Sequence, residues 1–368
     1  MTAPTLDATV PPRGFRRTTP GTASRPTSTY SALLAEVREA GLLRRRTGFY
    51  VLVFSAVTAV LLGAGTGFVL LGDSWFQLIV AGVLGIVFTQ YAFLAHEAAH
   101  RQVFASNTAN DRVGRVLAAG MVGMSYDWWM SKHSRHHANP NAIGKDPDIA
   151  VDVVSFVEED AARQRGVLRW LTQRQGWAFF PLLLGEGVNL HVTSFRSLLR
   201  RGRVEGRAFE ITLVVLRLAL YLGVVFVALP LGMAFAFVGV QLAVFGVYMG
   251  ASFAPNHKGM AIVPAGTKLD FLRKQVLTSR NVTGGRWVTA AMGGLDHQIE
   301  HHLFPSMPRP HLRRARVLVQ RHCAAEGIPY TEATLVQSYA IVVRYLNRVG
   351  LAARDPFDCP AAAALRPR

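Results

Sequence analysis

The residues of this sequence whose types and spacing suit chemistry are its histidines. The chain has 368 residues and 12 histidines, and nine of these lie in four short segments, at 96–100, 133–137, 257 and 297–302. Residues three or four apart share one face of a helix, about 5–6 Å from each other, so each multi-histidine segment presents its imidazoles together. Neutral imidazole binds iron, zinc, copper and nickel. The spacing therefore predicts a metal site built from several segments.

The number of imidazoles indicates two metal ions, because one ion takes about four to six ligands. The candidate metal ligands, which are also the candidate catalytic residues, include eight histidines: His96, His100, His133, His136, His137, His257, His301 and His302. Three further candidates stay open, namely Gln298, His297 and, through a water, Asn256. Many histidines with little carboxylate and no cysteine fit a redox pair of irons better than a structural zinc site.

Each single histidine pair has a plainer explanation as an ordinary core or surface feature. Residues 96–100 also match the HExxH pattern of zinc peptidases. A peptidase would leave the segments at 133–137 and 297–302 unexplained, so the combined pattern favours the two-ion site.

The elements that position these histidines follow from the distribution of charge. Half of the residues are hydrophobic, only 17% are charged, and the formal net charge is still +17, whereas soluble domains carry about 25% charged residues. Uncharged runs cover residues 47–72, 74–95 and 218–256, and a membrane-spanning helix needs about 20 apolar residues. We expect an all-α integral membrane protein with spans at about 48–71, 75–95, 211–230 and 233–254, arranged as two hairpins. This composition excludes an intrinsically disordered chain.

The positive charges predict the orientation of these spans. Arg44, Arg45 and Arg46 precede the first span, Arg200, Arg201 and Arg203 precede the third, and Lys258, Lys268, Arg273 and Lys274 follow the fourth. Because loops rich in Lys and Arg stay in the cytoplasm, we expect both termini and a helical cap that holds the metal site on that side of a bacterial inner membrane. The same location of the charges argues against nucleic acid as a partner.

The expected organisation is a disordered N-terminal tail (1–28), a single domain (29–349) and a flexible C-terminal tail (350–368). The cap comprises residues 96–210 and 255–349. Within it, residues 29–43, 309–326 and 333–349 are predicted to be helical. Two apolar patches, 116–130 and 176–190, are too short to span a membrane, so they are either interfacial or packed against the bundle.

The histidine segments resemble those of the membrane fatty acid desaturases, whose three boxes read HxxxH, HxxHH and [HQ]xxHH. Here they are His96 with His100, His133 with His136 and His137, and Gln298 with His301 and His302. The run from Gly294 to Pro305, GLDHQIEHHLFP, is similar to the QIEHH-type bacterial and actinobacterial acyl desaturase branch. Residues 129–133 and 252–257 resemble the stretches before the second box and after the fourth span.

The resemblance implies a non-haem di-iron centre that uses O₂ to remove two hydrogens from a fatty acyl chain, carried as acyl-CoA or acyl-lipid. It differs at Gln298, where many desaturases have histidine, and His297 is the alternative ligand by geometry. No HPGG haem motif is present, and about 45 residues precede the first span, too few for a cytochrome b5 domain. We therefore expect a separate electron donor, a ferredoxin- or cytochrome b5-like protein with its reductase.

Two other functions remain as alternatives. A hydroxylase or ketolase of the same superfamily would share the centre, since the chemistry diverges only after C–H abstraction. A histidine-rich metal transporter is disfavoured because transport ligands are expected near the middle of the membrane.

Several residues are candidates for supporting roles. Nearby carboxylates that can accept the second N–H of a ligating histidine are Glu97, Asp127, Asp146, Asp148, Asp296 and Glu300. Aromatic residues that can line an acyl tunnel or anchor at the interface are Tyr126, Trp128, Trp129, Trp177, Phe179 and Phe180. Cations that can hold an anionic head group are Arg101, Arg135, Arg196, Arg200, Arg201 and Arg203. His191 is expected to be structural or substrate-related, together with Glu186 and Asn189, and Arg217 is expected to snorkel to the interface.

Overall fold

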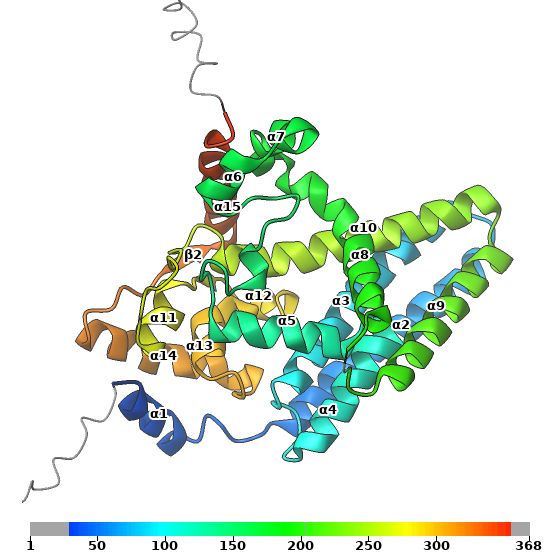
Figure 1. Cartoon of the computed structure of the whole chain (residues 1–368). Helices are drawn as coiled ribbons and strands as arrows, with labels where there is room; N and C mark the ends of the chain where they lie inside the picture. Colours follow the sequence, from blue (N-terminus) through cyan, green and yellow to red (C-terminus); the bar gives the residue numbers. More distant parts are fainter. Residues whose placement is uncertain (1–28, 203, 355–368) are drawn as a thin grey trace, which may run out of the picture.

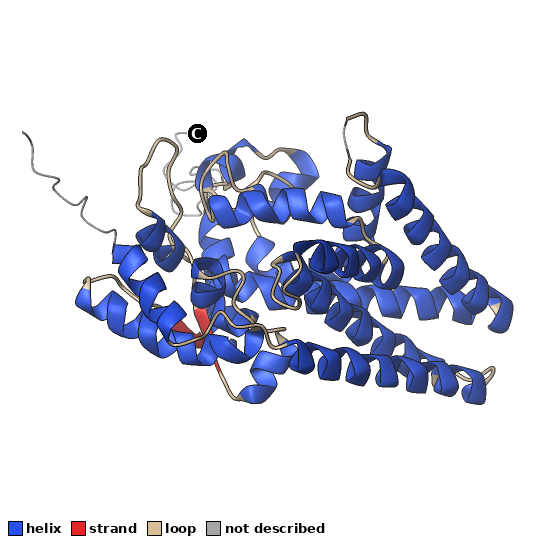
Figure 2. Ribbon diagram, turned by 90° about the horizontal axis from the view of Figure 1, so that it is seen from below, coloured by secondary structure: helices blue, strands red, loops and turns tan. Residues whose placement is uncertain are grey.

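The computed structural model describes residues 29–202 and 204–354, and this part of the chain is mostly helical (Figures 1 and 2). The expected N-terminal tail, Arg203 and residues 355–368 of the expected C-terminal tail lie outside the described residues. The described part contains four helices long and apolar enough to cross a membrane: α2 (Thr47–Leu71), α3 (Gln77–Ala99), α9 (Arg207–Ala228) and α10 (Leu231–His257). They overlap the four spans expected from the sequence, with ends that differ by up to four residues.

Two of these helices continue beyond the expected spans. Helix α3 was expected to end near residue 95 and α10 near residue 254, but they end at Ala99 and His257. The extension of α3 contains Glu97 and two alanines, which are good helix formers. His96 and His257 therefore sit on the helices themselves, where the backbone ladder fixes their direction.

The two short apolar patches are packed against the bundle. Residues 116–130 form a π-helix (Val116–Val122) that follows α4 (Asn107–Arg115), and then the start of α5 (Tyr126–Ala138). Residues 176–190 belong to a longer helix, α8 (Gln175–Leu199), which crosses α10 closely. A Cβ on Gly187 would overlap the carbonyl of Leu242, so this crossing requires glycine.

The remaining helices surround the ends of α3 and α10 that carry histidine. Helices α1 (Thr29–Glu39), α11 (Phe271–Leu277), α13 (Gln298–Leu303) and α14 (Arg309–Ala325) share one apolar core, which includes Leu33, Leu272, Ile299 and Val319. The helices α1 and α14 agree with the predictions for 29–43 and 309–326. Helix α15 (Leu335–Leu351), predicted at 333–349, packs with α6 (Glu158–Arg163) and α8, while α7 (Gly166–Thr172) also contacts α8.

A short two-stranded sheet, absent from the sequence-based expectation, ties two distant segments together. Strand β1 (Asn281–Thr283) pairs in parallel with β2 (Glu332–Thr334), as Figure 2 shows in red. Helix α12 (Arg286–Ala291) and two 3-10 turns, Pro147–Ile149 and Leu295–His297, complete the ordered elements described. Strand β1 also contacts the 3-10 turn Leu295–His297 and α13, which together carry the third histidine segment.

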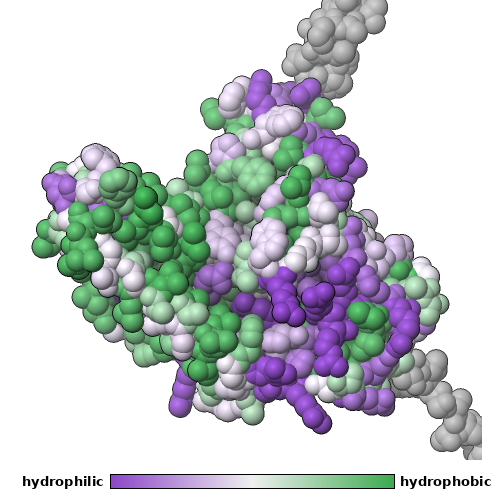
Figure 3. All heavy atoms as spheres, turned by 180° about the vertical axis from the view of Figure 1, so that it is seen from behind, coloured by the Kyte–Doolittle hydropathy of each residue, from purple (hydrophilic) through white to green (hydrophobic). Residues whose placement is uncertain are grey.

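Apolar residues cover the surface of the four long helices. On α2, Leu70 is 79% exposed, and on α9 Val227 is 89% exposed. In the face shown in Figure 3, this apolar arm lies on the left, and hydrophilic residues gather on the opposite part of the molecule. Such a large exposed apolar surface suits lipid rather than water, as expected for an integral membrane protein.

Candidate metal centre

Five histidines from three helices converge at the end of α3. His96 and His100 come from this end, His133 and His137 from α5, and His301 from α13, and one ring nitrogen from each lies within 4.8 Å of the others. We call them the five-histidine group. The i,i+4 spacing places both histidines of each pair on one helix face, so two helices supply four of the five.

The second cluster combines one residue from each of three elements. His136 of α5, His257 of α10 and His302 of α13 also bring one nitrogen each within 4.8 Å of one another. The Gln298 side-chain amide nitrogen lies 2.8 Å from His257 Nε2, and Asn256 Nδ2 donates to Gln298 Oε1 at 3.2 Å. We call the three histidines with Gln298 the three-histidine group.

The distances between ring nitrogens fit ligands of a common ion. His133 Nε2 lies 3.1 Å from His96 Nε2 and 2.8 Å from His100 Nε2, and His136 Nε2 lies 3.3 Å from His257 Nε2. Imidazoles bound to one metal at about 2.0–2.1 Å have nitrogens roughly 3 Å apart.

Each ring of the three-histidine group has its Nδ1 within hydrogen-bond distance of an oxygen from another residue. His136 Nδ1 lies 3.0 Å from both carboxylate oxygens of Asp146, His257 Nδ1 lies 2.9 Å from the Thr278 carbonyl oxygen, and His302 Nδ1 lies 2.9 Å from Gln275 Oε1. A neutral imidazole that donates through Nδ1 leaves a lone pair on Nε2. All three lone pairs then face the space between the rings.

The five-histidine group contains buried nitrogens that nothing satisfies among the described residues. His96 Nδ1, both ring nitrogens of His137 and His301 Nε2 have no hydrogen-bond partner. An unsatisfied buried polar atom costs about 1–3 kcal/mol, and a bound metal removes this cost at the nitrogen that ligates it. The donor set of both groups, mostly neutral imidazole, suits iron and excludes the harder cations calcium and magnesium.

Burial keeps the five-histidine group neutral. It lowers the pKa of His100 to about 3. Burial, followed by the neighbouring imidazoles, holds the pKa values of His133, His137 and His301 well below the usual range. Because an imidazole must lose its proton to bind a metal, these rings are ready to ligate near neutral pH.

His136 in the three-histidine group has the opposite shift. Burial lowers its pKa, but the nearby carboxylates of Asp148 and Asp146 outweigh burial and raise it. Lys132 lies 3.0 Å from Asp148 and balances part of this negative charge. The acidic pair therefore favours positive charge at His136, whether it is carried by a proton or by a metal.

The carboxylates expected to support the histidines divide into two sets. Asp146 and Asp148 contact His136 as expected, at 3.0 and 3.4 Å. The others bind elsewhere: Glu97 to Arg309, Asp127 to the backbone N–H of Glu205, Asp296 to Thr289 and His297, and Glu300 to Asn281 and Tyr330.

The two open candidates of the third box lie in different places. Gln298 points at the three-histidine group, whereas His297 belongs to neither histidine group and has Nδ1 2.9 Å from Asp296.

Three residues near the site were missed by sequence reasoning: Gln275, Thr278 and Arg309. No sequence signal identifies Thr278, because it acts through its backbone carbonyl.

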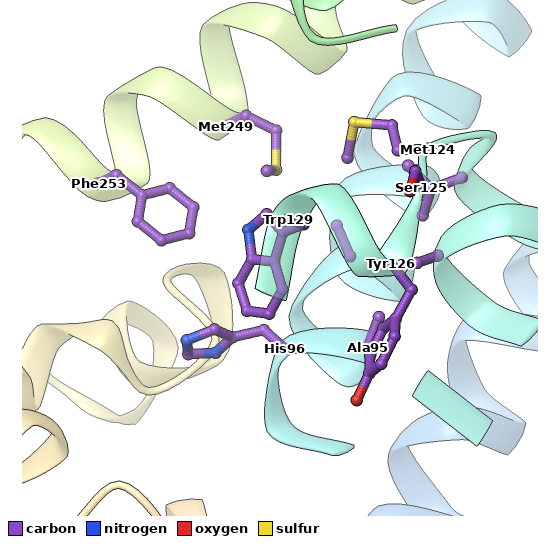
Figure 4. Close-up of a pocket in the computed structure, with 11 residues that line it drawn as sticks. Ala95, His96, Met124, Ser125, Tyr126, Trp129, Met249 and Phe253 are labelled. Carbon is purple, nitrogen blue, oxygen red and sulfur yellow. The ribbon is translucent and has the colours of Figure 1, made fainter. Parts of the chain in front are cut away.

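A small apolar pocket adjoins the five-histidine group (Figure 4). It is lined by Met249 and Phe253 of α10, by His96 and by Tyr126 and Trp129 of α5. The Trp129 ring also stacks on His133, with centroids 4.3 Å apart. Of the expected tunnel residues, only Tyr126 and Trp129 line this pocket, while Trp177 is 76% exposed and Phe179 is buried in another cluster.

A polar groove lies on the other side of α5, facing α8. Its charged lining residues are three acids and three bases: Asp127, Asp152, Glu186, Lys132, Arg135 and Arg200. Two of the arginines expected near a head group thus line the groove, whereas Arg101 pairs with Asp111. Arg196 and Arg201 are exposed and outside it.

Arg217 and His191 hold the end of the π-helix. Arg217 Nε donates to the Met121 carbonyl at 3.2 Å, and its guanidinium lies over the Phe88 and Tyr221 rings. His191 Nε2 lies 3.1 Å from the Val122 carbonyl oxygen. Arg217 therefore packs inward, contrary to the expected snorkelling, because these carbonyls and rings offer it partners within the fold.

Comparison with protein families matches residues 73–334 to the family described as fatty acid desaturase. Among curated proteins, Delta(8)-fatty-acid desaturase 2 of Arabidopsis thaliana is 27% identical over 341 residues, which cover 89% of this chain and 75% of the relative. Acyl-lipid (9-3)-desaturase of Borago officinalis is 28% identical over 289 residues, covering 74% and 64%. Delta(6)-fatty-acid desaturase fat-3 of Caenorhabditis elegans is 24% identical over 336 residues, covering 87% and 74%.

Proposed function

The chain belongs to the fatty acid desaturase family, and from this we propose that it inserts a double bond into the acyl chain of a membrane lipid, using O₂ and two iron ions. The observation that carries the proposal is the pair of histidine groups, whose nitrogens face two adjoining spaces at one end of the long helices. The five-histidine group would hold one ion. The three-histidine group would hold the other, with Gln298 rather than His297 beside it. Gln298 would ligate through Oε1 after its amide turns over, because Oε1 now accepts from Asn256 Nδ2 and Nε2 faces His257.

The bound irons would supply an oxidant strong enough to break a methylene C–H bond, which no side-chain acid or base can do. The protein's own residues position the chain. Trp129, Met249 and Phe253 offer an apolar surface beside His96 that excludes water and holds an alkyl segment against the five-histidine group.

The reaction balance requires an electron donor. Removing two hydrogens from an acyl chain while O₂ becomes two waters consumes two further electrons and two protons. We infer that a separate ferredoxin- or cytochrome b5-like protein supplies the electrons.

The polar groove supports an acyl-lipid rather than an acyl-CoA substrate. One face of α5 lines this groove, and the other face of the same helix lines the apolar pocket. Its three carboxylates and three cations suit a head group that carries both an ammonium and a phosphate, whereas the phosphates of CoA would leave the carboxylates without a cationic partner on the substrate. One of the similar proteins is itself named an acyl-lipid desaturase.

We infer the membrane orientation from the charges. In the sequence, the basic segments at 44–46 and 200–203 precede the first and third long helices, and Lys258, Lys268, Arg273 and Lys274 follow the fourth. With positive charge on the inner side, the spans form two hairpins whose histidine-bearing cap and termini face the cytoplasm of a bacterial inner membrane.

Lipid profiling of a host that expresses the chain tests the function. We expect a new double bond in fatty acids of phospholipids, dependent on air and abolished by His136→Ala. A hydroxyl or keto group instead of a double bond would contradict desaturation, and metal uptake by vesicles without oxygen consumption would support a transporter. Purified enzyme with a chemical reductant, offered acyl-CoA or phospholipid vesicles, separates the two substrate classes.

A further inference from the structure

A segment without histidine, residues 275–281, contacts several of the elements that bring histidines into the site. Gln275 makes two of these contacts. Its Oε1 accepts from His302 Nδ1 at 2.9 Å, and its Nε2 donates to the His137 carbonyl at 3.0 Å. One fully buried amide thus joins the second and third histidine boxes.

The middle of the segment holds the end of α10. The Thr278 carbonyl accepts from His257 Nδ1, and the Arg280 backbone N–H donates to the Asn256 carbonyl at 2.8 Å. The Arg280 side chain is only 1% exposed and donates to the carbonyls of Pro255 and Lys258. A cation at the C-terminal end of a helix is favourable, so Arg280 stabilises the last turn of α10, where His257 lies.

Asn281, at the end of the segment, holds α13. Its Oδ1 accepts from the Ile299 backbone N–H at 2.9 Å, and its Nδ2 donates to Glu300 Oε2 at 2.8 Å. Tyr330 donates to the other oxygen of Glu300 at 2.7 Å. These bonds fix the short helix from which Gln298, His301 and His302 project, so Asn281 supports both histidine groups.

We propose that the first part of this segment, through Gln275 and Thr278, positions the rings of the three-histidine group and sets the affinity of that group for its ion independently of the five-histidine group. The inference rests on the proposed two-ion function. The segment accepts hydrogen bonds from the rings of His257 and His302, which are both in the three-histidine group. Its one bond to a residue of the five-histidine group reaches the backbone of His137, not the ring. Loss of the contacts that Gln275 and Thr278 make with these two rings should therefore weaken the binding of one ion only.

Gln275 is the positioning residue that a substitution tests most cleanly. With Gln275→Met, a side chain of similar length remains but His302 Nδ1 loses its acceptor. The loss of an outer partner weakens metal binding by about 10–100-fold. We expect this loss at one ion only. Gln275→Glu restores the acceptor for His302 Nδ1, although not the donor to the His137 carbonyl, and should recover most of the affinity.

The experiment is an anaerobic titration of the purified metal-free protein with Co²⁺, followed by absorption spectroscopy, with bound iron also counted after Fe²⁺ loading. Wild type should take up two ions. Gln275→Met should keep one at wild-type affinity and bind the other 10–100-fold more weakly. Arg273→Gln is the matched control, because Arg273 lies on the same helix, is exposed and pairs only with Asp270 among its described ion pairs.

Three outcomes would overturn the inference. Equal weakening of both ions in Gln275→Met, no weakening of either, or no recovery in Gln275→Glu would each do so while the proposed function stands. Uptake of fewer than two ions by wild type would instead contradict the proposed function itself. If Gln275→Met does not fold, Gln275→Asn, which is polar but one methylene too short to reach His302, replaces it with the same expected result.

Discussion

The two histidine groups are built in different ways. Four of the five histidines in the five-histidine group come as i,i+4 pairs from the ends of two helices, α3 and α5. The three-histidine group takes one ring from each of α5, α10 and α13. The Nδ1 of each ring faces an acceptor outside the group, on Asp146, Thr278 or Gln275. The first group is thus set by helix geometry and the second by hydrogen bonds between distant segments.

The difference also appears in the charges around each group. Glu97, which lies between His96 and His100, is 1% exposed and receives two hydrogen bonds from Arg309, at 2.7 and 2.5 Å. The charge of Glu97 is therefore balanced by Arg309, and its carboxylate is not an acceptor for a histidine ring. In the three-histidine group, Asp146 is offered directly to His136. Near the five-histidine group, the buried carboxylate of Glu97 holds α3 against α14 through Arg309. In the three-histidine group, the buried carboxylate of Asp146 orients the ring of His136 itself.

The largest expected effect comes from removing one ligand of each group. We expect His133→Ala and His136→Ala both to abolish desaturation, by more than the roughly 100-fold that follows loss of an outer partner. Metal counting should separate them, because His133→Ala should release the ion of the five-histidine group and His136→Ala that of the other. Parallel lipid profiles and iron content measure both effects. Full activity in either variant would contradict the two-ion assignment.

The next largest effect is expected from the buried ion pair. Arg309→Met leaves the carboxylate of Glu97 buried and alone, which should destabilise the fold by about 3–5 kcal/mol. Thermal unfolding in detergent measures this. The double variant Glu97→Gln with Arg309→Met removes both charges and should recover much of the loss. If the double variant is as unstable as the sum of the two single variants, the pair does not pin α3 to α14.

The features that the sequence predicts are those set by local patterns, and the features that it does not predict depend on contacts between distant segments. Charge-free runs and i,i+4 spacing are local signals, so the four spans and the metal-ligand candidates were accessible. Among the outer partners, Asp146 lies only 10 residues from His136 and was one of the expected carboxylates. The others are distant in the sequence: Gln275 lies 27 residues from His302, Thr278 lies 21 from His257, and Arg309 lies 212 from Glu97. Neither the residue types nor the spacing of Gln275, Thr278 and Arg309 identifies them, and only the folded chain brings them to the site.

A smaller effect should arise when an outer partner of the three-histidine group is changed. Asp146→Asn keeps the shape of the side chain but removes its charge beside His136. We expect metal affinity at this group to fall by about 10–100-fold, with the five-histidine group unaffected, as measured by Co²⁺ titration. Asp127→Asn is the control, because Asp127 is also on the cap but contacts the Glu205 backbone. Equal loss at both groups would remove the distinction between them.

The smallest effect is expected at the amide that completes the three-histidine group. Gln298 lies against His257, while His297 faces Asp296. Gln298→Ala should weaken only the ion of this group, by about tenfold, the low end of what a supporting contact provides. Gln298→His, which places an imidazole there, should keep that ion. His297→Ala should leave both ions bound. If His297→Ala loses the ion and Gln298→Ala keeps it, the neighbouring histidine is the ligand, and the third box uses its residues in a different register from the one proposed.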